Sequence, residues 1–157
     1  MKLEPYIKAI PEGSHGSGTL QKRLWKACSD YCRIRDFHNF GTCVATGKYL
    51  ESWQSCDGGH YIPYSTCNGI FKFSPENVHA QSSGSNKWGG ERDKIRYQLE
   101  LEERYGKKYP RYLIKKNRDT PNTLRTEELK DLLKEILLEM KDLPEQPSYF
   151  ARVMSLI

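Results

Sequence analysis

Three side chains whose types suit hydrolytic chemistry follow one another at defined spacing in the middle of the chain. His60 lies within the Asp57–Pro63 segment, Asn77 comes seventeen residues later, and Asn86 follows nine residues after that. An imidazole titrates near neutral pH and can therefore accept a proton from water. Amide and carboxylate oxygens can orient such a ring or hold a hard divalent cation. Together, groups of these types could hydrolyse a phosphodiester bond.

Each of these residues receives a role in that chemistry. His60 is the candidate general base, and Asn77 is the candidate group that holds its ring in one tautomer. Asp57 and Asn86 supply oxygen atoms suited to one Mg²⁺ or Mn²⁺ ion, with His79 as an additional ligand. We therefore expect a catalytic set of His60, Asn77 and Asn86, and a metal site of Asp57, Asn86 and His79.

Ordinary structural roles compete with each assignment. A histidine that follows two glycines, or an asparagine that follows Pro75 and Glu76, is common in turns. Asn86 could be a helix cap. For any single residue we favour the structural role. Because all of these residues occur together in the order and at the spacing of a known nuclease motif, we favour the catalytic interpretation for the group.

In the first half of the chain, one helix followed by short strands must position these residues. Apolar residues from Leu20 onward recur at helical spacing after a suitable N-cap residue, and they predict a helix over residues 20–35. Residues 37–56 predict short strands with a tight turn near Gly47. The Pro75–Asn77 segment is expected to open a second short strand.

The second half of the chain is predicted to be helical. A helix that starts near Asn86 should stop at Gly106, because glycine is the usual residue after a helix end. Residues 107–117 mix basic and aromatic side chains, which suits either nucleic-acid contact or a helix on the core. Thr126–Asp142 has a continuous apolar stripe. We interpret this stripe as core, with a homodimer contact as the alternative.

These elements predict an α+β fold. Its centre is a small ββα hairpin–helix unit framed by the other helices. Residues 1–18 are predicted to form a flexible N-terminal arm, residues 19–106 the nuclease-like core, and residues 107–157 a helical extension packed on that core.

The charge of the chain favours a polyanionic partner. The 157 residues carry a formal net charge of +5, and because residues 126–142 carry −3, the remainder carries +8. A basic body of this kind attracts DNA, although an ordinary solvated surface could have the same charges. The candidate phosphate contacts are Lys22, Arg23, Lys26, Lys87, Arg92, Lys107, Lys108 and Arg111.

The sequence also indicates a cytoplasmic protein without a membrane segment. It has no run of eighteen apolar residues, and its N-terminus lacks the apolar core of a signal peptide. Its five cysteines are an odd number without a secreted spacing pattern, which indicates reduced thiols.

Three segments together carry a resemblance to a known family. Asp57–Tyr61, Asn77–Gln81 and Ser85–Lys87 have the order and spacing of the ββα-metal (HNH) nuclease motif. Over residues 20–106 the chain resembles the bacteriophage NinG (Rap) recombination endonucleases. The resemblance implies a divalent-metal-dependent DNA endonuclease that acts on branched recombination intermediates in the host cytoplasm. By position, it implies His60 as the base.

The chain departs from this family at its metal-binding positions. Relatives usually carry two Cys-x-x-Cys pairs that bind a structural zinc, and the corresponding pairs here are Cys43 with Thr46 and Ser82 with Ser85. Because three of four thiolates are missing, we expect no structural zinc. Many HNH enzymes also have an acidic or histidine ligand immediately before the base, where this chain has Gly59.

Two further functions compete with the nuclease. A degenerate HNH-like module could bind branched or duplex DNA without cutting it, and its basic and aromatic residues would look the same. A weaker alternative is an interaction protein that binds its partner through the Leu129–Met140 stripe. The presence of His60, Asn77 and Asn86 favours the enzyme, since a binding module has no need of an imidazole at that place.

Overall fold

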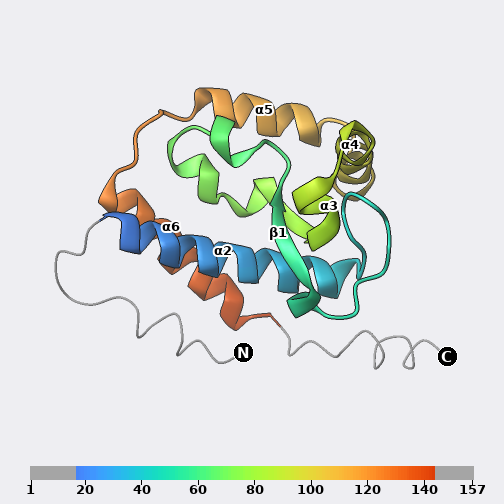
Figure 1. Ribbon diagram of the computed structural model, residues 1–157. Coiled ribbons are helices and arrows are strands. Elements are labelled where there is room, and N and C mark those ends of the chain that lie inside the picture. Colours follow the sequence, from blue (N-terminus) through green and yellow to red (C-terminus); the bar gives the residue numbers. More distant parts are fainter. Residues whose placement is uncertain (1–16, 144–157) are drawn as a thin grey trace.

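The computed structural model describes residues 17–143 (Figure 1). Most of the predicted N-terminal arm and residues 144–157 of the predicted extension lie outside the described residues. The helices and strands are α2 (Ser17–Asn39), β1 (Cys56–His60), β2 (Val78–Ser82), α3 (Ser83–Trp88), α4 (Glu91–Tyr105), α5 (Tyr109–Asp119) and α6 (Thr126–Lys141). Short 3₁₀ helices occupy Trp53–Ser55, Tyr64–Thr66, Gly69–Phe73 and Pro75–Asn77.

The hairpin of β1 and β2 lies between two groups of helices. α2 and α6 run along one side of the molecule and α5 lies along the opposite side, with β1 between them (Figure 1). The strands are antiparallel and pair His60 with Val78 and Asp57 with Gln81. α3 follows β2 directly, so the chain order is strand, strand, helix. The predicted α+β class is confirmed.

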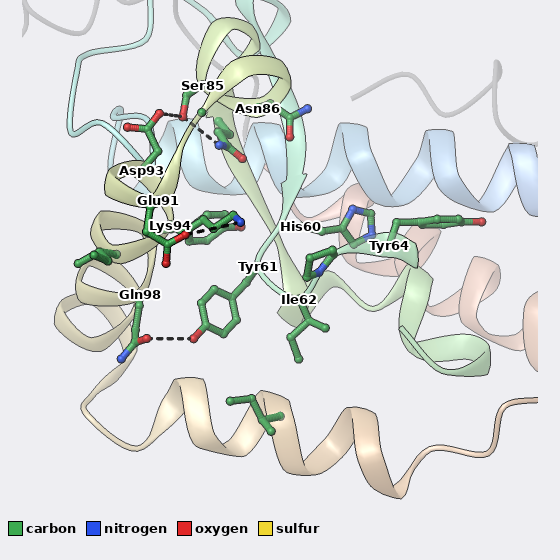
Figure 2. A pocket seen from close by; sticks show the side chains of 16 residues that line it. His60, Tyr61, Ile62, Tyr64, Ser85, Asn86, Glu91, Asp93, Lys94 and Gln98 are labelled. Atoms are coloured by element: carbon green, nitrogen blue, oxygen red, sulfur yellow. Dashed lines mark hydrogen bonds and ion pairs between the residues drawn. The ribbon is translucent and has the colours of Figure 1, made fainter. Parts of the chain in front are cut away.

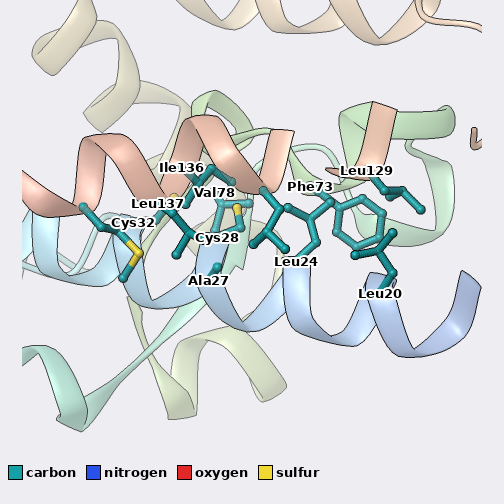
Figure 3. Close-up of a cluster of buried hydrophobic side chains, with 12 residues drawn as sticks. Leu20, Leu24, Ala27, Cys28, Cys32, Phe73, Val78, Leu129, Ile136 and Leu137 are labelled. Carbon is teal, nitrogen blue, oxygen red and sulfur yellow. The ribbon is translucent and has the colours of Figure 1, made fainter. Parts of the chain in front are cut away.

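One apolar core joins α2, α6 and the hairpin (Figure 3). α2 contributes Leu20, Leu24, Ala27, Cys28 and Cys32, and α6 contributes Leu129, Leu133, Ile136, Leu137 and Met140. Phe73 and Val78 belong to the same cluster, which links the helix pair to β2 and the turn before it. Burying a side chain of this size contributes about 1.5–3 kcal/mol. The interpretation of the α6 stripe as core is confirmed.

The single helix expected before Gly106 is broken into α3 and α4. Gly89 and Gly90 separate the two helices, and both have extended backbone angles. A Cβ at Gly89 would overlap the Ser85 carbonyl oxygen, so only glycine permits this close turn. The predicted end is confirmed, because Gly106 terminates α4 with a φ of 98°.

The segment between α2 and β1 contains less strand than predicted. One isolated bridge joins Thr42 to Tyr49. Gly47 makes the expected turn with a φ of 69°, in the left-handed region that glycine adopts without strain. The segment is therefore a compact turn, and it needs other contacts to hold it against the hairpin.

Cys43 provides such a contact. Its Sγ accepts a hydrogen bond from the Ser82 N–H at 3.2 Å and lies 3.6 Å from Ser82 Oγ. Burial acts to raise the pKa of Cys43, but hydrogen bonds from Ser82 and Thr46 outweigh it and lower the pKa. All five cysteines are buried free thiols. Cys43, Thr46 and Ser82, which correspond to three of the four zinc-binding positions of the relatives, are thus joined by hydrogen bonds. The absence of a structural zinc stays a prediction.

A buried ionic network fastens α2 to β2. The Asp36 carboxylate accepts hydrogen bonds from Arg35 Nε at 2.7 Å and from the Ala80 N–H at 2.9 Å, and it lies 3.0 Å from His79 Nδ1. Arg35 also donates to the carbonyl oxygens of Pro75 and Val78, both at 2.9 Å. Burial acts to raise the pKa of Asp36, but Arg35 and His79 hold it well below the ordinary carboxyl range.

Replacing Asp36 by asparagine should lower the free energy of unfolding by about 3–5 kcal/mol, because Arg35 would be left buried without its counter-charge. Urea denaturation monitored by circular dichroism measures this change. The matched control is Asp119→Asn, whose side chain is 52% exposed beside Arg118 and which should cost less than about 1 kcal/mol. Equal effects of the two substitutions would contradict the structural role of the network.

Candidate functional site

His60 stands at the end of β1 and lines a cleft of about 610 Å³ (Figure 2). Its ring stacks on Trp25 of α2, with centroids 4.8 Å apart, and Tyr64 meets it edge-on. His60 Nε2 lies 2.8 Å from the Lys72 carbonyl oxygen. Because a carbonyl can only accept, Nε2 carries the proton, and in the neutral ring Nδ1 holds the lone pair. The ring is therefore held in one orientation and one tautomer.

The surroundings of His60 also favour its neutral form. Burial lowers the pKa of His60 below its ordinary value, and the hydrogen bond to the Lys72 carbonyl opposes this only in part. A neutral imidazole with an unprotonated nitrogen is the form that a general base requires. At neutral pH this side chain is consequently ready to accept a proton.

Asn77 does not orient His60, so that prediction is wrong. Its buried amide accepts the Ile62 N–H at 2.9 Å and donates to the Ile62 carbonyl at 3.0 Å and to Cys67 Sγ at 3.4 Å. Asn77 therefore closes the loop that follows β1, while the Lys72 carbonyl fixes the imidazole. A backbone carbonyl has no residue signature, so this partner of His60 could not be predicted from the sequence.

His79 is not placed as a cation ligand, and this prediction is also wrong. The side chain is fully buried, with Nδ1 3.0 Å from Asp36 Oδ2 and Nε2 3.1 Å from the Glu76 carbonyl oxygen. Arg35 Nη2 lies 3.1 Å from the same Nδ1. Both ring nitrogens are thus occupied by the network that holds α2 to β2.

Asp57 and Asn86 lie side by side, and their role as cation ligands stays a prediction. Asn86 Nδ2 lies 3.2 Å from Asp57 Oδ2, and Ser83 Oγ donates to Asp57 Oδ1 at 3.0 Å. Asn86 is exposed on α3 and lines the cleft together with His60. The oxygen and nitrogen of an amide can exchange places by rotation, so Asn86 can present its oxygen to a cation beside Asp57.

The side chains of Asp57 and Asn86 suit a Mg²⁺ ion and do not suit a zinc ion. Among residues 17–143, no three His, Cys, Asp or Glu side chains are grouped so that they could hold a metal ion. Mg²⁺ keeps several waters and often uses only one or two carboxylates, so a carboxylate with amide oxygens fits it. Tetrahedral zinc sites need more nitrogen or sulfur ligands than are present at Asp57 and Asn86.

The predicted phosphate contacts lie on several elements of the structure. Lys22, Arg23 and Lys26 flank Trp25 on α2, although Lys26 also pairs with Asp30 at 2.8 Å. Lys87 and Arg92 are exposed on α3 and α4. Lys107, Lys108 and Arg111 line a second hollow, which shares Tyr61, Gln98 and Ile114 with the cleft. The candidate phosphate contacts are thus spread over the chain from α2 to α5.

Sequence reasoning missed several residues at this site. Trp25 supports the imidazole, and Ser83 holds Asp57. Trp88 does not line the cleft, but it is 87% exposed on the same helix as Asn86. Helical spacing places Trp25 next to basic residues but gives no signal that it meets β1, which is distant in sequence.

The family of the chain follows from its sequence match. Residues 14–146 match the family model described as Bacteriophage Lambda NinG protein. The chain belongs to the NinG family. The match covers every described residue, so the family pattern includes α5 and α6 as well as the hairpin. No curated protein and no solved structure gives a significant match. Within the described part of this NinG family member, no helix has the length and apolar character needed to span a bilayer.

The pKa of His60 should lie below about 6.5, the ordinary value for histidine. Because Trp25 covers one face of the ring, Trp25→Ala should expose it to water and raise the pKa toward the ordinary value. Titration of the ring signals by NMR, assigned by their loss in His60→Ala, measures both values. Trp53→Ala is the control, since Trp53 packs beside Arg33 and should leave the His60 pKa unchanged. A wild-type pKa above 6.5 would contradict the burial argument.

Proposed function

We propose that this NinG family member is an HNH-type DNA endonuclease that depends on Mg²⁺ or Mn²⁺ and hydrolyses phosphodiester bonds in branched recombination intermediates. The observation that carries the proposal is the state of His60. Its ring lines a cleft, is fixed in one tautomer by the Lys72 carbonyl, and has a lowered pKa. The position at the cleft separates His60 from His79, whose pKa is also lowered by burial but whose side chain is fully enclosed.

In this proposal, each residue at or near the cleft has a separate role in hydrolysis. His60 Nδ1 takes a proton from the attacking water, and the Lys72 carbonyl stabilises the imidazolium that forms because it already accepts from Nε2. Asp57 and Asn86 would hold the cation, which would offset charge on the phosphate and on the leaving 3′ oxygen. Asn77 keeps the loop after β1 closed, so that the ring stays at the cleft.

The surface around the cleft supports DNA as the substrate. Lysine and arginine side chains can neutralise backbone phosphates along the hollow between α4 and α5. Trp88, on the same helix α3 as Asn86, offers an exposed aromatic face, and such faces stack on unpaired bases. Branched intermediates that carry single-stranded segments present such bases, and the family resemblance points to branched substrates.

The second candidate is a DNA-binding module that does not cut. It is supported by the small number of charged cation ligands, since no cluster of three His, Cys, Asp or Glu side chains occurs within residues 17–143 and Gly59 precedes His60. Both candidates use the same basic surface. Cleavage, and not binding, therefore decides between them.

Replacing His60 by alanine should lower the cleavage rate by about 10²–10⁴-fold, which is the contribution typical of a general base. Plasmid and four-way-junction DNA are incubated with protein in Mg²⁺, Mn²⁺ or EDTA, and DNA binding is measured in parallel. EDTA should abolish cleavage by the wild type. His60→Ala should retain binding, because the substitution leaves every candidate phosphate contact in place.

His38→Ala is the matched control, because His38 is exposed at the end of α2, outside the cleft. This variant should cut like the wild type. If the wild type binds DNA but cuts none with either metal, the binding module is correct. If His60→Ala cuts as fast as the wild type, His60 is not the base.

A further inference from the structure

Asp57 and Asn86 alone would give a cation two protein ligands, and the hairpin carries a third oxygen on the same face as Asp57. Gln81 of β2 is the register partner of Asp57 in β1. Directly paired residues in an antiparallel hairpin have Cβ atoms about 4.5–5.5 Å apart, on the same face. Gln81 also lines the cleft that contains Asn86 and His60.

The side chain of Gln81 lies across Gly59. A Cβ added at Gly59 would overlap Gln81 Oε1, so the amide oxygen occupies the space that a side chain at position 59 would fill. Because side chains alternate along a strand, positions 57 and 59 share a face of β1. The Gln81 oxygen is thus on the same face as the Asp57 carboxylate.

A relay of hydrogen bonds fixes which end of the Gln81 amide points toward Gly59. Ser85 Oγ donates its hydrogen to Asp93 Oδ2 at 2.8 Å, as Figure 2 shows. Its oxygen is then an acceptor, and Gln81 Nε2 donates to it at 3.0 Å. The amide nitrogen must therefore face α3 and the oxygen must face the hairpin. Gln81 is only 7% exposed, so this orientation is held by its surroundings.

We propose that Gln81 Oε1 is a third protein oxygen of the cation site formed by Asp57 and Asn86. The inference rests on the proposed function, because it assumes that the site takes a divalent cation. One carboxylate and two amide oxygens give the site a charge of −1, which suits a hard cation that keeps several waters. Gly59 is then required, since any larger residue would displace the Gln81 oxygen.

Direct Mn²⁺ binding tests this ligand without relying on cleavage. The full chain is used in a His60→Ala background so that added four-way-junction DNA stays uncut, and bound Mn²⁺ is measured by electron paramagnetic resonance with and without DNA. Gln81→Leu should weaken Mn²⁺ binding about tenfold or more. Gln81→Glu should tighten it about tenfold, because a carboxylate replaces a neutral oxygen.

Gln98→Glu is the matched control, because Gln98 lines the same cleft but bonds to Tyr61 and Glu102. It adds the same charge and should change Mn²⁺ binding much less than Gln81→Glu. Tighter binding by Gln81→Glu cannot arise from unfolding, so the test does not depend on the stability of Gln81→Leu.

The outcomes separate this inference from the proposed function. If Asp57→Asn loses Mn²⁺ while both Gln81 variants bind like the parent, Gln81 is not a ligand, and the nuclease proposal stands. If binding depends on Gln81 but the wild-type chain cuts no DNA, the site is as inferred and the nuclease proposal fails. If the parent binds no Mn²⁺ with or without DNA, the inferred site is overturned.

Discussion

The buried charge of Asp36 is the constraint on which the rest of the structure depends. A carboxylate with no exposure must be compensated, and here Arg35, His79 and the Ala80 N–H surround it. These contacts fix the C-terminal half of α2 against β2, and Arg35 extends them to the turn before β2. Because α2 is one continuous helix, the same contacts determine where Trp25 meets the ring of His60. The Asp36 network thus helps to position His60, the candidate base, through α2 and Trp25.

The orientation of His60 depends on loop closure and not on a second catalytic side chain. The chain between the strands folds back so that the Lys72 carbonyl reaches the imidazole, and Asn77 closes this loop onto Ile62. Asn117 of α5 holds the loop from the other side, accepting the Asn68 N–H at 2.7 Å and donating to the Thr66 carbonyl at 3.2 Å. The C-terminal extension is consequently part of the site's support, which agrees with a family match that continues to residue 146.

The sequence predicted those features that depend on local pattern. The apolar stripe of α6, the end of α4 at Gly106 and the pairing of Asp57 with Asn86 were all accessible from spacing and residue type. What failed depended on distant or backbone partners. His79 is committed to Asp36, forty-three residues away, and the acceptor for His60 is a carbonyl that any residue could supply. The role proposed for Gln81 had no sequence signal, because it depends on the side chain of Gln81 filling the space over Gly59.

The pH dependence of the second-order rate constant for DNA cleavage tests the central claim most directly, because this quantity reports the protonation of the free protein. It is measured with Mg²⁺ at subsaturating protein for the wild type and His60→Ala. Since the base must be neutral and burial lowers its pKa, the wild-type rate should rise with pH through a midpoint below about 6.5, and the residual rate of His60→Ala should lack this rise. The same acidic limb in both proteins would contradict the assignment of His60 as the base.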